Sequence, residues 1–302
     1  MDRMKAYMFE ILRKALVATT GRGYDRTPAI NDLHHKLAYR LHKMLPFFRI
    51  RGVQKISVPG LPDKFIYVRA EDGGVAHQFI MYHQYEPFET EIVRQELKPG
   101  MKVYNIGANV GYYVLVASEC VGTNGIVCGF EPAPSNLFLL HKMVQENHLA
   151  NVRIFGAALG DRDGIAGLAL SESNSGDHQL RDYPDREQVP VPIHSVDGLC
   201  ARGVPEPDVI LMDVQGSELE VLRGMRGYIR SGKPSIIFTE FAPKTLNERE
   251  ENGAKEFLDL LTSNGYSLTI LDEKQKRLIP TTTEELLRDT VGYEEKNLLC
   301  KR

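Results

Sequence analysis

KVYNIGANVGYY, at residues 102–113, carries the strongest indication of fold in this chain of 302 residues. Residues 103–106 form a short, mostly apolar run that predicts a buried β-strand, and residues 112–120 continue as an apolar helix. Gly107 and Gly111 lie between them, where glycine permits a tight turn and lets a ligand approach the backbone and the first amides of the helix. Because a glycine-rich turn from a strand into a helix is common, the stretch alone predicts a βα unit and leaves its ligand open.

The alternation of strands and helices continues from this stretch to the end of the chain. Strands are predicted at 103–106, 126–130, 152–155, 209–212, 235–239, 267–271 and 297–300, and helices at 112–120, 135–148, 218–228 and 255–264. Residues 160–193 are rich in Ser, Asp and Gly and predict a less regular insertion. Strands that alternate with helices indicate βαβ units, so the expected fold is α/β with a mostly parallel, Rossmann-like sheet of seven strands.

The residues before this region predict a separate, mainly helical N-terminal extension. Helices are expected near 2–18 and 30–46, and short strands at 54–58 and 64–69. A further helix at 87–97 falls at the beginning of the α/β domain. The first two helices are separated by a break that contains Gly21, Gly23 and Pro28. The predicted domains are therefore 1–84, the extension, and 85–302, the α/β domain.

The charge is unevenly distributed along the chain. The first 51 residues, here named the basic arm, hold 11 Lys and Arg against 4 Asp and Glu, whereas the net charge of the whole chain is −3. This overall charge gives no reason to expect a nucleic-acid partner. A solvated helical face explains the basic arm most simply, and contact with an anionic partner or a membrane surface is the alternative.

Cysteine usage and hydropathy predict a cytoplasmic protein without a metal site. The four cysteines are scattered and no two of them have CxxC spacing, which argues against disulfides and zinc. No apolar run approaches the roughly 18 residues of a membrane-spanning helix. Charged residues also interrupt the N-terminus, where a secretory signal would be apolar.

Glu131 is the first candidate binding residue outside the glycine loop. It follows the predicted strand at 126–130 and lies twenty residues after Gly111, the spacing at which a carboxylate reaches the ribose hydroxyls of a nucleoside. An ionised carboxylate can accept hydrogen bonds from both vicinal hydroxyls. The alternative is that Glu131 caps the helix that follows it.

The glycine loop favours a nucleoside without phosphates. Dinucleotide folds use GxGxxG, in which the middle glycine lets the backbone contact a pyrophosphate. Here the spacing is GxxxG and Asn109 occupies the middle. S-adenosylmethionine (SAM) is a ligand that fits such a loop.

Three further residues are candidates for catalysis at the carboxyl edge of the sheet. Asp213 follows the strand at 209–212, where it could bind the SAM amino group or accept a proton from a substrate hydroxyl, and Glu240 is expected on the same rim. His178 lies in the polar insertion and is a further candidate base, although an exposed loop histidine is the simpler interpretation. A structural role at a strand-to-helix junction is the alternative for Asp213. Glu218 is interpreted as structural, because a negative charge is favoured in the first turn of a helix.

Taken together, the chain resembles the FkbM family of SAM-dependent methyltransferases over about residues 85–300. The matching motifs are Lys98-Pro99-Gly100, Gly107-Ala108-Asn109-Val110-Gly111-Tyr112-Tyr113, Phe130-Glu131-Pro132, Asp213-Val214-Gln215-Gly216-Ser217-Glu218 and Pro234-Ser235-Ile236-Ile237 leading to Glu240. The resemblance implies a class I methyltransferase sheet whose last strand is antiparallel, SAM as the methyl donor, and a small hydroxylated acceptor such as a sugar or natural product. It also implies that the residues that bind SAM are Asn105, Gly107, Asn109, Gly111, Tyr112, Glu131 and Asp213.

Two departures from the family pattern keep rival functions open. Asn105 stands where the family usually has Asp, and Leu211 stands where it often has Lys. A protein that binds SAM but does not catalyse transfer is therefore the first alternative to a hydroxyl methyltransferase. An NAD-dependent oxidoreductase is the second, and the missing GxGxxG counts against it.

Overall fold

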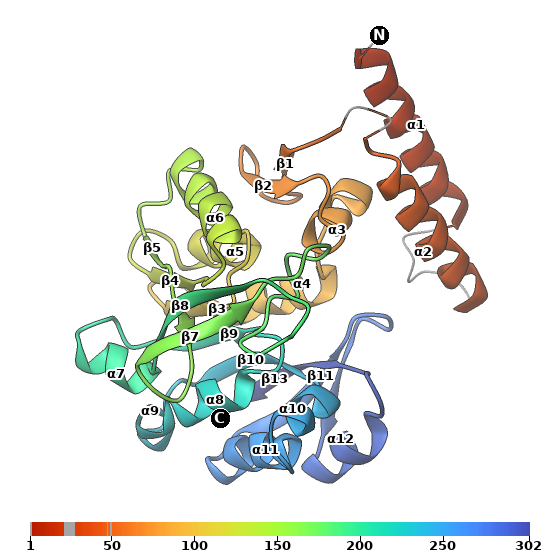
Figure 1. Cartoon of the computed structure of the whole chain (residues 1–302). Coiled ribbons are helices and arrows are strands. Elements are labelled where there is room, and N and C mark those ends of the chain that lie inside the picture. The colour runs from red at the N-terminus through yellow and green to blue at the C-terminus, as the bar shows by residue number, and fades with distance from the viewer. Residues whose placement is uncertain (1, 21–27, 47, 49) are drawn as a thin grey trace. The chain divides into compact units, whose positions relative to one another are not determined.

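The computed structural model describes residues 2–20, 28–46, 48 and 50–302 (Figure 1). Residues 21–27 and 49, which include Gly21 and Gly23 of the predicted break and the basic-arm residues Arg22, Arg26 and Arg49, lie outside the described residues. The chain divides into two compact units. One comprises the residues up to Pro87 together with Ser171–Asp177, and the other comprises Phe88–Leu170 and His178–Arg302.

The larger unit contains a single eight-stranded sheet with the strand order β12-β11-β13-β10-β9-β3-β4-β5. The strands are β3 (Lys102–Ile106), β4 (Ile126–Phe130), β5 (Val152–Phe155), β9 (Val209–Met212), β10 (Ile236–Phe241), β11 (Ser267–Asp272), β12 (Arg277–Thr281) and β13 (Lys296–Lys301). From β5 to β10 each strand pairs parallel with the next, whereas β13 is antiparallel to both β10 and β11. The predicted α/β, Rossmann-like sheet with an antiparallel last strand is confirmed.

The expected number of seven strands is wrong, because β12 adds an eighth at the edge of the sheet. It pairs antiparallel with β11 and places Pro280 opposite Thr269. Proline and exposed residues are tolerated on an edge strand, where one side has no ladder to complete. The same features hide such a strand from a search for apolar runs.

Helices cover both faces of the sheet. They are α4 (Pro87–Glu96), α5 (Tyr112–Val121), α6 (Pro134–Glu146), α7 (Val196–Ala201), α8 (Glu218–Arg223), α9 (Arg226–Arg230), α10 (Pro243–Arg249), α11 (Gly253–Ser263) and α12 (Thr283–Asp289). On one face Phe130 of β4 belongs to a buried cluster with Leu222 of α8 and Phe257 of α11. On the other face a Cβ at Gly129 would lie 3.0 Å from Val114 of α5, so this helix lies directly on the strand. Each fully buried side chain of this size contributes roughly 1.5–3 kcal/mol.

The helix expected at 218–228 is interrupted, and forms α8 and α9. The break includes Gly224, where an added Cβ would lie 1.9 Å from the backbone oxygen of Gly160. Glycine is the poorest helix former after proline, and here it is also required by the close approach of another segment.

The insertion expected to be irregular contributes two strands to a small sheet, whereas its residues 170–187 form no helix or strand. The strands of this sheet are β6 (Ala158–Leu159), β7 (Gly164–Ala169) and β8 (Gln188–His194), in the order β6-β8-β7. Val191 and Ile193 of β8 point into a separate small core with Leu168, as period-two alternation requires. The intervening Pro190 and Pro192 obscure this strand in the sequence, because proline normally argues against a strand.

The smaller unit contains α1 (Asp2–Thr20), α2 (Pro28–Lys43), β1 (Val53–Ser57), β2 (Phe65–Arg69) and α3 (Val75–Tyr82). Arg13 of α1 donates a hydrogen bond of 3.0 Å to the carbonyl of Met81, and His34 of α2 lies 3.1 Å from the Tyr82 hydroxyl, so α3 ties the two long helices together. The sequence did not predict α3. The domain boundary after residue 84 and the role of the basic arm stay predictions. None of the helices in the described ranges is long and apolar enough to cross a membrane.

Candidate active site

The glycine loop between β3 and α5 packs against the loop that follows β9. Gly107 has φ +80°, and a Cβ added there would lie 1.8 Å from the backbone oxygen of Asp213. A residue with a side chain is therefore excluded at this position by both its dihedral and its space. The two loops meet backbone to backbone, and this contact fixes Asp213 beside the glycine loop.

Gly111, the second glycine, serves the packing of helices. It has φ +94°, and a Cβ there would come within 2.5 Å of Leu140 and Met143 of α6. Gly111 thus lets the beginning of α5 approach α6 closely, and its place in the loop is explained by packing as well as by any ligand.

Glu131 lies directly after β4 and is almost fully buried, with 5% of its surface exposed. Its Oε2 accepts a hydrogen bond of 2.7 Å from the backbone N–H of Asn109, and its Oε1 accepts one of 2.9 Å from the N–H of Ala133. Burial raises the pKa of Glu131 to about 7, although these bonds and one with Asn136 oppose the rise. A carboxylate can accept about four hydrogen bonds, so beside these three bonds one acceptor position remains for a ligand hydroxyl.

The two readings of Glu131 are compatible. Its bond to Ala133 satisfies an amide at the beginning of α6, as the capping alternative requires. Its bond to Asn109 places the same carboxylate against the glycine loop, as ribose binding requires. The ribose role stays a prediction that this geometry permits.

Asn105 presents a buried acceptor at the carboxyl end of β3. Its Nδ2 donates to the carbonyl of Leu211 at 3.4 Å, which orients the amide because a carbonyl only accepts. Its Oδ1 has no hydrogen-bond partner within the described part of the chain, and the residue is only 4% exposed. Such an orphaned acceptor costs about 1–3 kcal/mol, so the position suits a ligand that donates a hydrogen bond.

Tyr112 begins α5 and lies against α4. Its hydroxyl is 3.2 Å from the Oγ1 of Thr90, and its ring packs edge-on against Tyr113. That Tyr112 contacts a cofactor stays a prediction. Asn109, in the loop itself, has φ +48° and its side chain accepts from the N–H of Val110, which shapes the turn.

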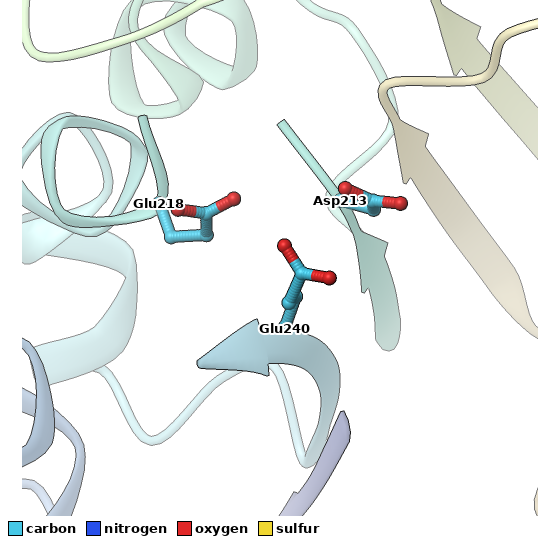
Figure 2. Close-up of side chains that lie close together, drawn as sticks. All are labelled: Asp213, Glu218 and Glu240. Atoms are coloured by element: carbon cyan, nitrogen blue, oxygen red, sulfur yellow. The ribbon is translucent and has the colours of Figure 1, made fainter. Parts of the chain in front are cut away.

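Asp213 and Glu240, the two carboxylates predicted at the carboxyl edge of the sheet, lie close together, and Glu218 lies beside them. Oxygens of Asp213, Glu218 and Glu240 all lie within 4.8 Å of one another. Figure 2 shows the carboxyl groups of Glu218 and Glu240 turned toward each other with Asp213 beside them. Asp213 follows β9, Glu240 belongs to β10, and Glu218 begins α8, so three elements meet at this carboxylate cluster.

Two residues of this cluster were missed as functional candidates. Gln215 has φ +53°, and its Nε2 donates to Asp213 at 2.7 Å and to Glu240 at 3.5 Å. Glu218 was interpreted as a helix-terminal acid, and its Oε1 does accept from the N–H groups of Val214 and Gly216. The available signal was the short loop between Asp213 and Glu218, which returns the chain to the same edge of the sheet.

His178, the third predicted base, lies in the insertion, between β7 and β8. It is half-buried and directly precedes Gln179, which forms a bridge with Ala169. It does not join the carboxylate cluster among the residues described. Its participation in catalysis stays a prediction.

Comparison with known proteins identifies the family of this fold. Residues 105–268, just over half of the chain, match the family model described as the methyltransferase FkbM domain. Over 147 residues the chain is 24% identical to the hexuronic acid methyltransferase AglP of Haloferax volcanii, a match that covers 47% of this chain and 59% of that protein. The chain therefore spans little more than half the length of this curated relative.

Solved structures with a similar arrangement include a methyltransferase and a fibrillarin. A methyltransferase FkbM from Methylobacillus flagellatus is 16% identical, with a TM-score of 0.42, over 74% of this chain and 52% of that chain. Fibrillarin from Aeropyrum pernix, solved with bound SAM, is 13% identical, with a TM-score of 0.41, over 72% of this chain and 74% of that chain. Neither likeness is strong enough to bear on the chemistry of the site.

Proposed function

Because this chain belongs to the FkbM methyltransferase family, we propose that it transfers a methyl group from SAM to a hydroxyl group of a sugar or another small metabolite. The observation that carries the proposal is the order of groups along one edge of the sheet. A buried carboxylate on β4, an orphaned acceptor on β3 and a pair of rim carboxylates on β9 and β10 follow one another where α/β folds bind ligands.

The residues present fit SAM. Glu131 would bind the ribose through the acceptor capacity that its three hydrogen bonds leave on the carboxylate. Asn105 would accept a hydrogen bond from the ammonium group with its orphaned Oδ1. When bound, SAM supplies a methyl group already activated on sulfur, so the main contribution of the protein is alignment, which reaches effective molarities of ~10⁵–10⁸ M in ideal cases.

Asp213 and Glu240 would act on the acceptor. Both lie at the carboxyl ends of neighbouring strands, next to the glycine loop that Gly107 holds against Asp213. A carboxylate there can orient a hydroxyl and take its proton, which is typically worth ~10²–10⁴-fold in rate. His178 stays a further candidate for this proton.

A sugar is the favoured acceptor class. The support is the relationship to a protein described as a hexuronic acid methyltransferase, at 24% identity. Polar groups that would contact hydroxyls, such as Gln215 beside Asp213, are consistent with a polyol substrate.

Calorimetric titration of the full chain with SAM, S-adenosylhomocysteine (SAH) and NAD tests the cofactor. We expect micromolar binding of SAM and SAH and no binding of NAD, and we expect Glu131→Ala to abolish both SAM and SAH binding. NAD binding in place of SAM would support the oxidoreductase alternative. SAM affinity that survives in Glu131→Ala would contradict the ribose site.

Transfer is tested separately with SAM carrying a labelled methyl group and a panel of free and nucleotide-linked sugars that includes hexuronic acids. Label on a sugar oxygen, located by mass spectrometry, is the expected result. Tight SAM binding with no transfer to any acceptor in the panel would favour the non-catalytic alternative, which Asn105 and Leu211 support.

A further inference from the structure

The carboxylate cluster contains an acceptor that is held in place and left without a donor. Glu218 is 1% exposed, and its Oε1 accepts hydrogen bonds of 3.0 Å from the N–H of Val214 and 3.2 Å from the N–H of Gly216. These bonds fix the carboxyl group, because both donors belong to the backbone of the loop before α8. The other oxygen, Oε2, is buried and has no hydrogen-bond partner in the part of the chain that the structure describes.

The surroundings of Glu218 make this arrangement costly without a further positive group. Its neighbours Asp213 and Glu240 are acids of like sign, with oxygens within 4.8 Å of its own. The amide of Gln215 donates to Asp213 and Glu240, and as a neutral group it offsets only part of their repulsion. Buried carboxylates that stay ionised are normally paired with a cation or coordinate a metal.

The spacing of the oxygens matches the coordination sphere of one ion. Oxygens bound to Ca²⁺ lie about 2.3–2.6 Å from the metal and those bound to Mg²⁺ about 2.0–2.1 Å, so two ligands on opposite sides of an ion are about 4.0–5.2 Å apart. The oxygens of Asp213, Glu218 and Glu240 all lie within 4.8 Å of one another. All three ligands are hard oxygen donors, which favour Mg²⁺, Ca²⁺ and Mn²⁺ over zinc or copper.

We propose that Asp213, Glu218 and Glu240 bind one divalent cation, each through one carboxylate oxygen (Figure 2). The scattered cysteines argue against zinc, and this site contains none of them. Three protein ligands leave other coordination positions open to water or to an oxygen of a bound molecule.

The cation would orient the methyl acceptor, and this part rests on the proposed function. It would lie at the carboxyl ends of β9 and β10, next to the glycine loop, where the acceptor hydroxyl has to meet the donor. Two neighbouring hydroxyls of a sugar, or a hydroxyl and the carboxylate of a hexuronic acid, are suitable oxygen ligands for such an ion. The three carboxylates would then position the acceptor through the cation.

Metal binding is measured on the full chain after treatment with EDTA and desalting. Mn²⁺ is the probe, because its paramagnetic resonance signal reports the free ion, and Ca²⁺ and Mg²⁺ are titrated by calorimetry. We expect one Mn²⁺ site in the wild-type chain and an affinity at least about tenfold weaker in Glu218→Gln, because the loss of a charged ligand weakens such sites. Absence of binding for all three ions at millimolar concentration, or unchanged Mn²⁺ affinity in Glu218→Gln, would overturn the proposal.

Two controls separate a lost ligand from a damaged fold and from a failed cofactor site. The glutamine Oε1 can keep both backbone bonds of Glu218, and its new Nε2 can donate toward Asp213 and Glu240. We therefore expect Glu218→Gln to be at least as stable as the wild type in EDTA, and Mn²⁺ to raise the melting temperature of the wild type alone. Glu131→Gln is the matched buried carboxyl: it should bind Mn²⁺ normally and lose SAH affinity, whereas Glu218→Gln should keep SAH affinity. Mn²⁺ binding without SAH binding in the wild type would retain the metal site and reject the proposed function.

Discussion

At the scale of single residues, the two departures from the family pattern touch each other. Asn105 and Leu211 are partners in the register of β3 and β9, and the amide of Asn105 donates to the carbonyl of Leu211. An acid at 105 and a lysine at 211 would face each other on the same side of the sheet. Their joint replacement by an amide and an apolar residue removes both charges and leaves no unpaired ion in a buried position. The sequence shows both changes, but their relationship depends on strand register, which only the fold provides.

The buried carboxyl of Glu131 predicts a pH dependence of nucleoside binding. Its pKa is raised to about 7 by burial, and hydrogen bonds from ribose hydroxyls favour the ionised form. Affinity for the ligand should therefore be complete above this pKa and fall as the pH decreases through about 7. Between about pH 8 and about pH 6 the ionised fraction drops from roughly nine tenths to one tenth, so affinity should fall by up to about ninefold.

Calorimetric titration with SAH checks this dependence, and 5′-methylthioadenosine, which has the same ribose without the ionisable amino acid, serves as the second ligand. The same fall for both ligands assigns the effect to the nucleoside end. A pH-independent affinity in the wild type, or an equal pH dependence in Glu131→Gln, would remove Glu131 as the group responsible.

At the scale of elements, the strands that are buried on both faces could be predicted from the sequence, whereas two partly exposed strands could not. β3, β4 and β9 are central strands that are apolar on both faces, so their runs are visible and their carboxyl ends locate Glu131 and Asp213. β12 lies at an edge and β8 alternates buried residues with prolines, so neither gives an apolar run. The position of Glu218 was predictable as a helix terminus, whereas its approach to Glu240 depends on how two loops fold back to one edge.

The contact between the loops after β3 and β9 makes Gly107 the most sensitive position of the glycine loop. Gly107→Ala should destabilise the protein by at least about 3 kcal/mol, because a strained dihedral and a clash with the carbonyl of Asp213 add together. Gly203 is the matched control: it has φ +84°, close to that of Gly107, but nothing within 4 Å of an added Cβ. Gly203→Ala should cost only the backbone strain, about 1–2 kcal/mol.

Urea denaturation of both variants measures the difference in the free energy of unfolding, and SAH titration measures its consequence for the site. We expect Gly107→Ala to lose SAH binding and Gly203→Ala to keep it. Equal destabilisation by the two substitutions would show that the clash between a Cβ at position 107 and the carbonyl of Asp213 does not lower the free energy of unfolding.

At the scale of the whole molecule, the two compact units do not follow the linear order of the chain. The domain boundary that the sequence predicts after residue 84 stays a prediction, and Ser171–Asp177 belongs to the same compact unit as the N-terminal residues. Asp72 accepts hydrogen bonds from the N–H and the hydroxyl of Ser175 at 2.7 and 2.9 Å, and Gly73 donates to the carbonyl of Ser173. The composition along the chain cannot reveal these hydrogen bonds, because Asp72 and Ser175 are about a hundred residues apart.

This tie predicts how the segment responds to protease. Asp72→Ala removes both bonds to Ser175, and each bond to a charged acceptor contributes about 1.5 kcal/mol or more, so local opening should become at least about tenfold more frequent. A glutamate-specific protease should then cut after the exposed Glu172 correspondingly faster, as followed by mass spectrometry of the full chain. Ser173→Ala is the control, because Ser173 contributes its backbone carbonyl to the tie and that group is unchanged. Equal cleavage rates in the wild type and Asp72→Ala would mean that other contacts hold this segment, whereas faster cleavage in Asp72→Ala alone would assign its order to a residue of the N-terminal unit.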